Sequence, residues 1–150
     1  MKVQRLGEYE ERRHRATHRV ILTHADLTEA TANTAQTIAL LTVTAGTVLH
    51  SCFTRLVTAF ADASDAAFNA TAITIGDGGD VDRAITSQEL NVNGTEVLFK
   101  ANANTLPYAY LAGDTIDIVV GSMSAKSLVD IDTGELHVYL AVSDLTDIQL

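Results

Sequence analysis

The stretch Ala72-Ile73-Thr74-Ile75-Gly76-Asp77-Gly78-Gly79-Asp80 decides the fold class of this chain. It begins with β-branched residues, whose side chains are stiff at χ1 and suit a pleated strand. It ends in a glycine-rich acidic turn, where Gly76, Gly78 and Gly79 are expected to supply backbone angles that other residues reach only at a cost. Similar units recur along the chain without a catalytic motif between them. The sequence therefore predicts a β scaffold that acts through its surfaces.

Further strand signals lie on both sides of this stretch, separated by turn signals about every dozen residues. The clearest is 134–144, where Leu136, Val138, Leu140 and Val142 alternate with polar or small residues. Pro107, the only proline, lies outside the expected central strands. This pattern is typical of an antiparallel β-sandwich, and we expect an all-β jelly roll. The strands expected besides 72–75 and 134–144 are 18–23, 36–43, 48–60, 96–100 (after an Asn93-Gly94 turn) and 114–121.

Two segments are ambiguous. In 48–60 the apolar residues fall at helical spacing, but the β-branched content favours a long strand that is partly buried on both faces. In 81–91 we expect one helical turn, with Ser87 as its N-cap.

Charge divides the chain into an N-terminal arm, residues 1–16, and a body, residues 17–150. The net charge is −9, yet residues 1–19 carry +3 and the remainder −12. The arm is expected to be extended, with a short helix near 8–13. Docking onto an acidic or hydrogen-bonding protein groove suits arginine, whose planar head donates two hydrogen bonds side by side. A solvated tail and nucleic-acid contact are the alternatives, and the acidic body opposes the second. The candidate partner-binding residues are Arg5, Arg12, Arg13, Arg15 and Arg19.

The residues that carry most enzyme and metal chemistry lack the necessary spacing. Cys52 is the only cysteine, so no internal disulfide forms; we expect a buried, inert thiol, with a reactive thiol or an intersubunit bridge as alternatives. No H-E-x-x-H pair is present, although a distant pairing of His50 with His137 stays open. No serine lies in a G-x-S-x-G turn. We expect no catalytic site, no cofactor and no bound metal.

The acidic turn fails the calcium pattern, since the twelfth position counted from Asp77 is Gln88 and not Glu. A solvated turn is favoured, and a weak cation site at 77–82 is the alternative. A phosphate cradle at 76–79 is disfavoured by the neighbouring negative charge. The chain begins with a charged segment in place of a secretory signal, and no apolar run is long enough for a membrane helix. We expect synthesis in a cytoplasm and no contact with membranes.

Two blocks of the sequence resemble the capsid cement (decoration) proteins of tailed bacteriophages. The first runs from Arg55-Leu56-Val57-Thr58-Ala59-Phe60 through the stretch 72–80, and the second comprises 110–118 and 133–140. Such proteins are typically small jelly-roll domains that oligomerise on the shell exterior and bridge neighbouring major capsid protein subunits. Several of them use a terminal arm. The family has no catalytic residues to carry over.

The sequence and the resemblance together lead to one main functional hypothesis. The chain is expected to be a structural virion protein that binds the outside of a phage capsid and cements neighbouring major capsid protein subunits. Its expected partners are the major capsid protein and copies of itself, in a dimer or trimer, without nucleic acid. The alternatives are another virion β module, such as a tail or head–tail adaptor piece, and a carbohydrate-binding jelly roll. An enzyme would need a cleft with converging acids.

Overall fold

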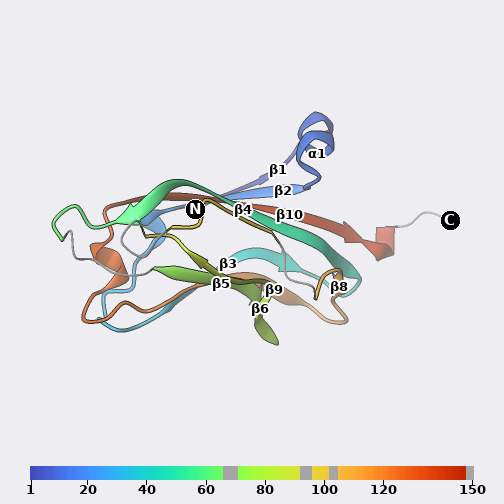
Figure 1. The fold of residues 1–150 in the computed structure, drawn as a ribbon. Coiled ribbons are helices and arrows are strands. Elements are labelled where there is room, and N and C mark those ends of the chain that lie inside the picture. Colours follow the sequence, from blue (N-terminus) through green and yellow to red (C-terminus); the bar gives the residue numbers. More distant parts are fainter. Residues whose placement is uncertain (66–70, 92–95, 102–104, 148–150) are drawn as a thin grey trace.

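The computed structural model describes residues 1–65, 71–91, 96–101 and 105–147, and within them the chain forms two antiparallel sheets packed face to face (Figure 1). Sheet A has the strand order β1-β2-β10-β4-β7, and β8 also pairs with β4. Its strands are β1 (Lys2–Arg5), β2 (His18–Thr23), β10 (Thr133–Asp144), β4 (Thr47–Ala61), β7 (Phe99–Ala101) and β8 (Tyr108–Ala109).

Sheet B has the strand order β3-β9-β5-β6. Its strands are β3 (Gln36–Val43), β9 (Asp114–Val120), β5 (Ala72–Asp77) and β6 (Asp80–Glu89). All pairings between these strands and within sheet A are antiparallel. The prediction of an all-β sandwich is confirmed at this level. Short 3-10 turns, at His24–Asp26, Leu128–Asp130 and Leu145–Asp147, complete the described elements with the helix α1 (Glu8–His14).

The core lies between the two sheets and follows the alternation of the strands. Leu136, Val138 and Leu140 of β10 are fully buried, and so are Ile116 and Ile118 of β9. Successive residues of a strand point to opposite faces, so each strand gives every second side chain to the core. The alternation predicted for 114–121 and 134–144 is confirmed, and the opposite faces of both sheets are left for other contacts.

The long strand at 48–60 is confirmed, and irregular pairing explains its helical spacing. In the pairing of β4 with β10, the register shifts between Ala141 and Val142, between Glu135 and Leu136, and between Thr133 and Glu135. Each extra residue in a strand shifts its inward-facing positions by one. The next buried position after Leu49 is therefore Cys52, and the next after Leu56 is Phe60, at spacings of three and four. A helix would produce the same spacing, so periodicity alone could not distinguish the two structures.

The helical turn expected in 81–91 is wrong, because Asp80–Glu89 is strand β6. This strand pairs with β5, and its register shifts between Ile73 and Ile75 and again before Asp77. These irregularities hide the period of two. Ser87 is an exposed strand residue and caps no helix.

Gly76 is required for a different reason from the one the sequence suggested. Gly76, Gly78 and Gly79 do not have φ in the positive range, so the prediction of special backbone angles is wrong. A Cβ on Gly76 would instead lie 2.0 Å from the carbonyl oxygen of Asp80. Glycine permits this close approach of β5 to β6 at the irregular end of the hairpin.

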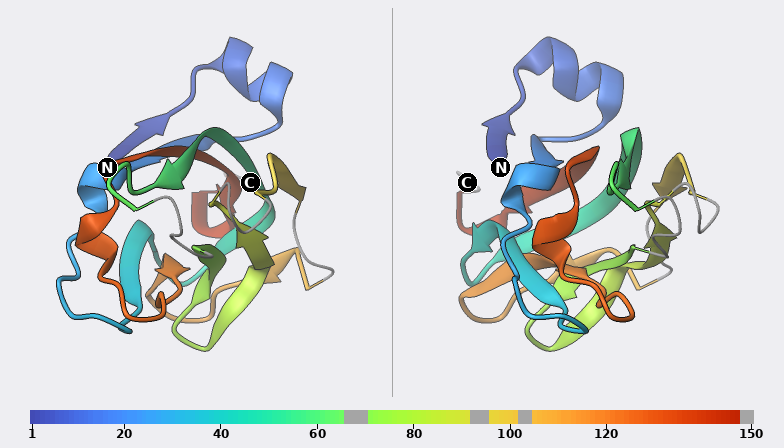
Figure 2. Two further views of the ribbon diagram at one scale, coloured as in Figure 1. Left: turned by 60° about the vertical axis from the view of Figure 1, so that its left-hand side comes forward. Right: turned by 90° about the vertical axis from the view of Figure 1, so that its left-hand side faces the viewer.

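The first residues belong to sheet A. β1 pairs with β2 from Lys2 opposite Ile21 to Arg5 opposite His18, and Leu6 and Ala16 are buried at its end. Between them α1, the short helix predicted near 8–13, projects from the sandwich (Figures 1 and 2). The described structure thus shows an edge strand and a projecting helix for residues 2–14. That residues 1–16 act as a unit separate from the body stays a prediction.

Candidate binding surfaces

The predicted arginines gather at one end of sheet A, which we call the basic pole (Arg5, Arg12, Arg15 and Arg19). Arg5 ends β1, Arg19 lies on β2, Arg12 lies in α1, and Arg15 follows α1 in a left-handed conformation with φ of 51°. Arg13 also lies in α1, but its side chain is outside the described part of the structure. The fold therefore brings together residues from three elements that the sequence presents as one linear arm.

The arginines of the basic pole differ in how far they are already engaged. Arg19 donates from Nη2 to Oε1 of Gln4 at 3.0 Å, across the β1–β2 pair. Arg12 pairs with Glu8 one turn earlier in α1, where both side chains are exposed. Exposed pairs of this kind contribute little to stability, so Arg12 is available to a partner at small cost. Arg15 is exposed at the end of the helix.

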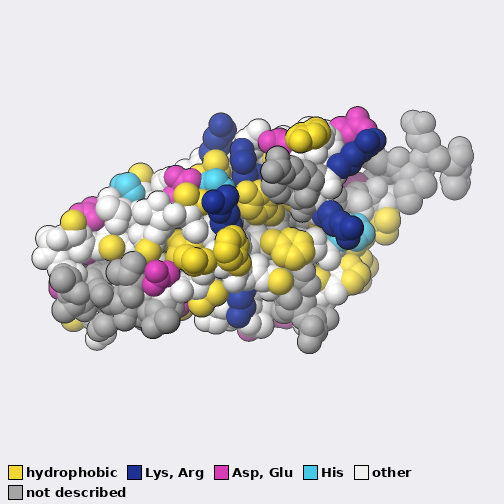
Figure 3. Space-filling model, turned by 45° about the horizontal axis from the view of Figure 1, so that its top comes forward, with side chains coloured by type: hydrophobic (Ala, Val, Ile, Leu, Met, Phe, Trp, Pro, Cys, Tyr) yellow, Lys and Arg dark blue, Asp and Glu magenta, His cyan; other side chains and the backbone are white. Residues whose placement is uncertain are grey.

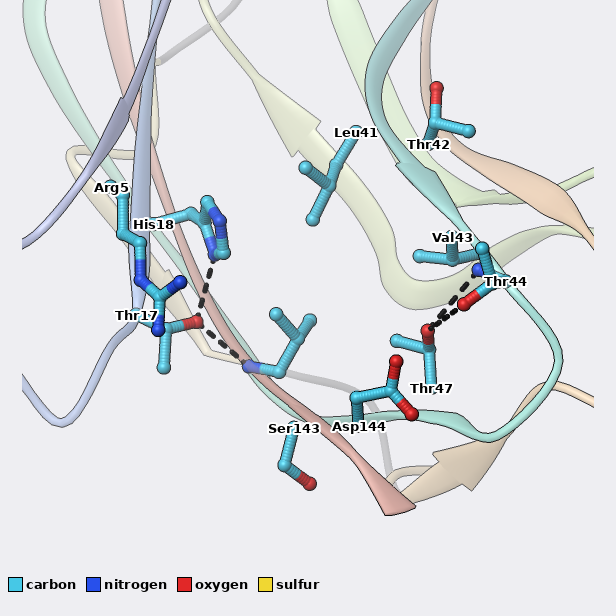
Figure 4. Close-up of a pocket in the computed structure, with 11 residues that line it drawn as sticks. Arg5, Thr17, His18, Leu41, Thr42, Val43, Thr44, Thr47, Ser143 and Asp144 are labelled. Atoms are coloured by element: carbon cyan, nitrogen blue, oxygen red, sulfur yellow. Dashed lines mark hydrogen bonds between the residues drawn. The ribbon is translucent and has the colours of Figure 1, made fainter. Parts of the chain in front are cut away.

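Arg5 lines a cavity of about 310 Å³ at the side of the sandwich where β2 of sheet A begins and β3 of sheet B ends (Figure 4). His18 lies beside it, and its Nδ1 is 2.9 Å from the hydroxyl oxygen of Thr17. Burial and the charge of Arg5 lower the pKa of His18, so a neutral imidazole is favoured. The cavity walls come from both sheets, with Asp144 as a carboxylate in the lining. This combination suits hydrogen bonding to a peptide or a side chain.

A second feature, which the sequence analysis missed, lies on the outer face of sheet A. We call it the aromatic hollow (Phe53, Thr54, Arg55, Phe99 and Tyr139), and its volume is about 230 Å³. Phe53 is 37% exposed and Phe99 is 68% exposed. Only the strand register shows the cluster, because it places Tyr139 opposite Phe53 and Phe99 opposite Arg55. Figure 3 shows apolar side chains gathered on this face with Lys and Arg around them.

A buried hydrogen-bond network lies beneath the aromatic hollow. Thr54 is buried and donates its hydroxyl to the side-chain oxygen of Gln88, a buried residue of β6. The Gln88 amide donates in turn to the carbonyl oxygen of Val97 at 2.7 Å. Buried polar groups whose partners are all supplied hold one geometry. Strand β4 is therefore anchored to β6 of sheet B beneath the aromatic hollow.

The glycine-rich turn is organised around a buried carboxylate. Asp77, 3% exposed, accepts hydrogen bonds from Nε of Arg83 at 2.5 Å and from the amides of Gly79 and Asp80, each at 3.0 Å. Arg83 also lies over the ring of Tyr108, 3.7 Å from its centroid. Burial alone would raise the pKa of Asp77, but the Arg83 guanidinium and the two amides outweigh burial and lower it. The Arg83 guanidinium, which belongs to the same hairpin, thus holds the turn in place.

The remaining candidate residues have structural partners. Within the described ranges, no group of three or more His, Cys, Asp or Glu side chains is placed to hold a metal ion. His50 bonds to Ser143 at 2.7 Å and His137 to Glu135 at 2.7 Å, so the open pairing of His50 with His137 is not formed. Cys52 is fully buried, and burial raises the pKa of its thiol to about 12. In the same part of the chain, no helix is long and apolar enough to cross a bilayer.

Comparison with known proteins identifies a shared fold. No protein-family model and no curated protein sequence matches the chain. Among solved structures, a chain described as "Cyanophage Pam1 capsid asymmetric unit" has a similar structure, with a TM-score of 0.54 and 14% sequence identity. The similarity covers 83% of this chain and 78% of that chain. At this identity the likeness establishes a common architecture, and function must be argued from the surfaces.

Proposed function

We propose that the chain is a structural virion protein that binds the outer surface of a phage capsid and cements neighbouring major capsid protein subunits. The observation that carries the proposal is the structural likeness to a chain of a cyanophage capsid asymmetric unit. It agrees with the resemblance of the sequence to capsid cement proteins. The proposed role includes no catalytic step and no cofactor, and it places the protein on the virion.

The strand order supports a jelly roll, which is common among viral capsid domains. In the described strands, β2 pairs with β10, β3 with β9, β4 with β7, and β5 with β6, all antiparallel. These are nested pairs, from the outermost strands to the innermost. Rolling one long antiparallel ribbon into two layers produces such nesting. We infer that this chain has the same topology.

The distribution of charge supports docking through the N-terminal end. The chain has ten Lys and Arg residues and a net charge of −9. Eight of these ten belong to residues 1–19 or to strands β4 and β7 of sheet A. The other two, Arg83 and Lys126, pair with Asp77 and Asp65. The basic pole therefore offers donors to acidic groups on a shell, while the rest of the molecule repels them.

Many copies on a symmetric shell would make weak individual contacts sufficient, because a copy that touches two subunits gains from the second contact without a second loss of freedom. A homo-oligomer, a dimer or a trimer, would add further contacts. This is the physical basis of the proposed cementing role.

Cosedimentation with undecorated capsids of the virus that encodes the chain tests the proposal. The informative variant is Arg5→Gln with Arg12→Gln and Arg15→Gln, because deleting residues 1–16 would also remove β1 and expose sheet A. Three exposed ion pairs at about 0.2–1 kcal/mol each predict roughly 3- to 150-fold weaker binding. The matched control, Thr37→Glu with Ala39→Glu and Thr86→Glu, changes the net charge equally on exposed positions of sheet B. Failure of the full chain to sediment with capsids would overturn the proposal.

A further inference from the structure

The aromatic hollow has the composition of a protein-binding hot spot. Interfaces are enriched in Tyr, Phe and Arg at their centres, and Phe53, Phe99, Tyr139 and Arg55 lie together there. The strand register places His137 on one side of Arg55 and Phe99 on the other. Glu135 is already bonded to His137. A side chain that is apolar and flanked by carboxylates would therefore fit this surface.

The opposite sheet carries such a group, which we call the acidic tip (Asp80, Val81, Asp82 and Asp114). Val81 is 56% exposed at the start of β6. Asp80 and Asp82 flank it in sequence, and Asp114 approaches the same turn, since a Cβ on Gly78 would lie 3.3 Å from its Oδ1. The Asp80 carboxylate, as a hydrogen-bond acceptor for the Asp82 carboxyl and as a like charge, raises the pKa of Asp82. An incoming guanidinium would relieve this crowding of negative charge.

The tip and the hollow lie on different sides of the molecule. The β5–β6 hairpin extends from sheet B away from sheet A in all three ribbon views, and the hollow is on the outer face of sheet A (Figures 1 and 2). If two hollows faced each other, the two Arg55 side chains would repel each other. If two tips met, their carboxylates would repel each other. Contact of unlike surfaces is therefore favoured over contact of like surfaces.

We infer that copies of this chain associate head to tail, with the acidic tip of one copy seated in the aromatic hollow of the next. Val81 would contact Phe53 and Phe99, and Arg55 would pair with Asp82. A contact between different surfaces on opposite sides cannot be reciprocated within one pair, so it generates a ring if it closes and a filament if it does not. This contact therefore excludes a dimer of two equivalent contacts, and it allows a trimer or a longer head-to-tail assembly. It is independent of capsid binding through the basic pole.

Sedimentation velocity of the full chain without capsids, from about 10 μM to 1 mM, tests the inference. The wild-type chain is expected to form trimers or larger species, more weakly in 0.5 M salt. Arg55→Glu in the hollow and Val81→Glu at the tip should each weaken association at least tenfold. The matched controls are Arg12→Glu and Val129→Glu, which make the same changes at exposed positions elsewhere and should associate like the wild type. Far-UV circular dichroism checks that every variant keeps the fold.

Mixing the two variants gives the most specific result. Arg55→Glu retains a functional tip and Val81→Glu a functional hollow, so a mixture should form heterodimers and stop there. A wild-type chain that stays monomeric at 1 mM would overturn the inference. So would a folded Arg55→Glu or Val81→Glu chain that assembles like the wild type, or a mixture of the two that stays monomeric.

Discussion

Replacing Asp77 by Asn tests whether the buried ion pair holds the β5–β6 hairpin. One carboxylate accepts hydrogen bonds from the Arg83 guanidinium, from the amides of Gly79 and Asp80, and from the hydroxyl of Tyr110 at 3.3 Å. Asparagine keeps the shape but removes the charge. It also turns one acceptor into a donor that faces other donors.

The expected cost follows from the burial of both partners. The side chains of Asp77 and Arg83 are 2% and 15% exposed, and Asp80 is 3.8 Å from the guanidinium as a weaker second partner. Removing one member of a buried pair costs about 3–5 kcal/mol. Asp80 still faces the Arg83 guanidinium in the variant, and Arg83 is partly exposed to solvent. We therefore expect Asp77→Asn to lower the free energy of unfolding by about 3 kcal/mol, near the lower end of this range. With an m-value of roughly 2 kcal/mol per molar urea, the unfolding midpoint should fall by about 1.5 M.

Urea unfolding followed by far-UV circular dichroism measures this change, because the chain has no Trp to serve as a fluorescence probe. The control is Asp82→Asn, an exposed carboxylate in the same hairpin, which should leave the midpoint unchanged. Adding Arg83→Met to Asp77→Asn should cost less than the sum of the two single changes, because both partners of the pair are then absent. If Asp77→Asn lowers stability by less than about 1 kcal/mol, the pair does not hold the hairpin.

Further predictions concern the same hairpin and the core. The pKa of Asp77 is lower in the folded than in the unfolded chain. Its contribution to folding stability is therefore fully present above the pKa of the unfolded chain, about 4, and is lost as the pH falls towards the pKa of the folded chain. Stability measured from pH 5 to 2 should therefore drop less in Asp77→Asn than in the wild type, and parallel curves would contradict this. Gly76→Ala should destabilise by about 2 kcal/mol or more, because its Cβ would meet the Asp80 carbonyl oxygen, whereas Gly113→Ala should be tolerated. Cys52 should react with a thiol reagent at pH 8 only as fast as the chain unfolds, and rapid labelling of the folded chain would refute its burial.

Strand composition and turns were sufficient to predict the sandwich, because most strands alternate cleanly. In β9, Ile116, Ile118 and Val120 face the core as predicted. Periodicity alone could not decide the segments whose pairing is irregular. Bulges in β4 imitate helical spacing, and there the β-branched content predicted the strand correctly. Register shifts hide the period of two in β6, and there the predicted helical turn is wrong.

The candidate surfaces were harder to predict than the fold. Charge counting identified the arginines of the basic pole, since net charge is a property of the sequence itself. It could not show that β1 joins sheet A, which brings Arg5 beside His18. The aromatic hollow depends on cross-strand neighbours that are far apart in sequence, such as Tyr139 and Phe53. Such neighbours become visible only when the register is known.

Electron cryo-microscopy of capsids incubated with a saturating amount of the chain tests the central claim most directly. Density for a two-layered sandwich is expected on the outside of the shell, over the junctions between major capsid protein subunits. The basic pole, with Arg5, Arg12 and Arg15, should face the shell. Density confined to the interior or to the tail, or bare shells under saturating conditions, would contradict the account.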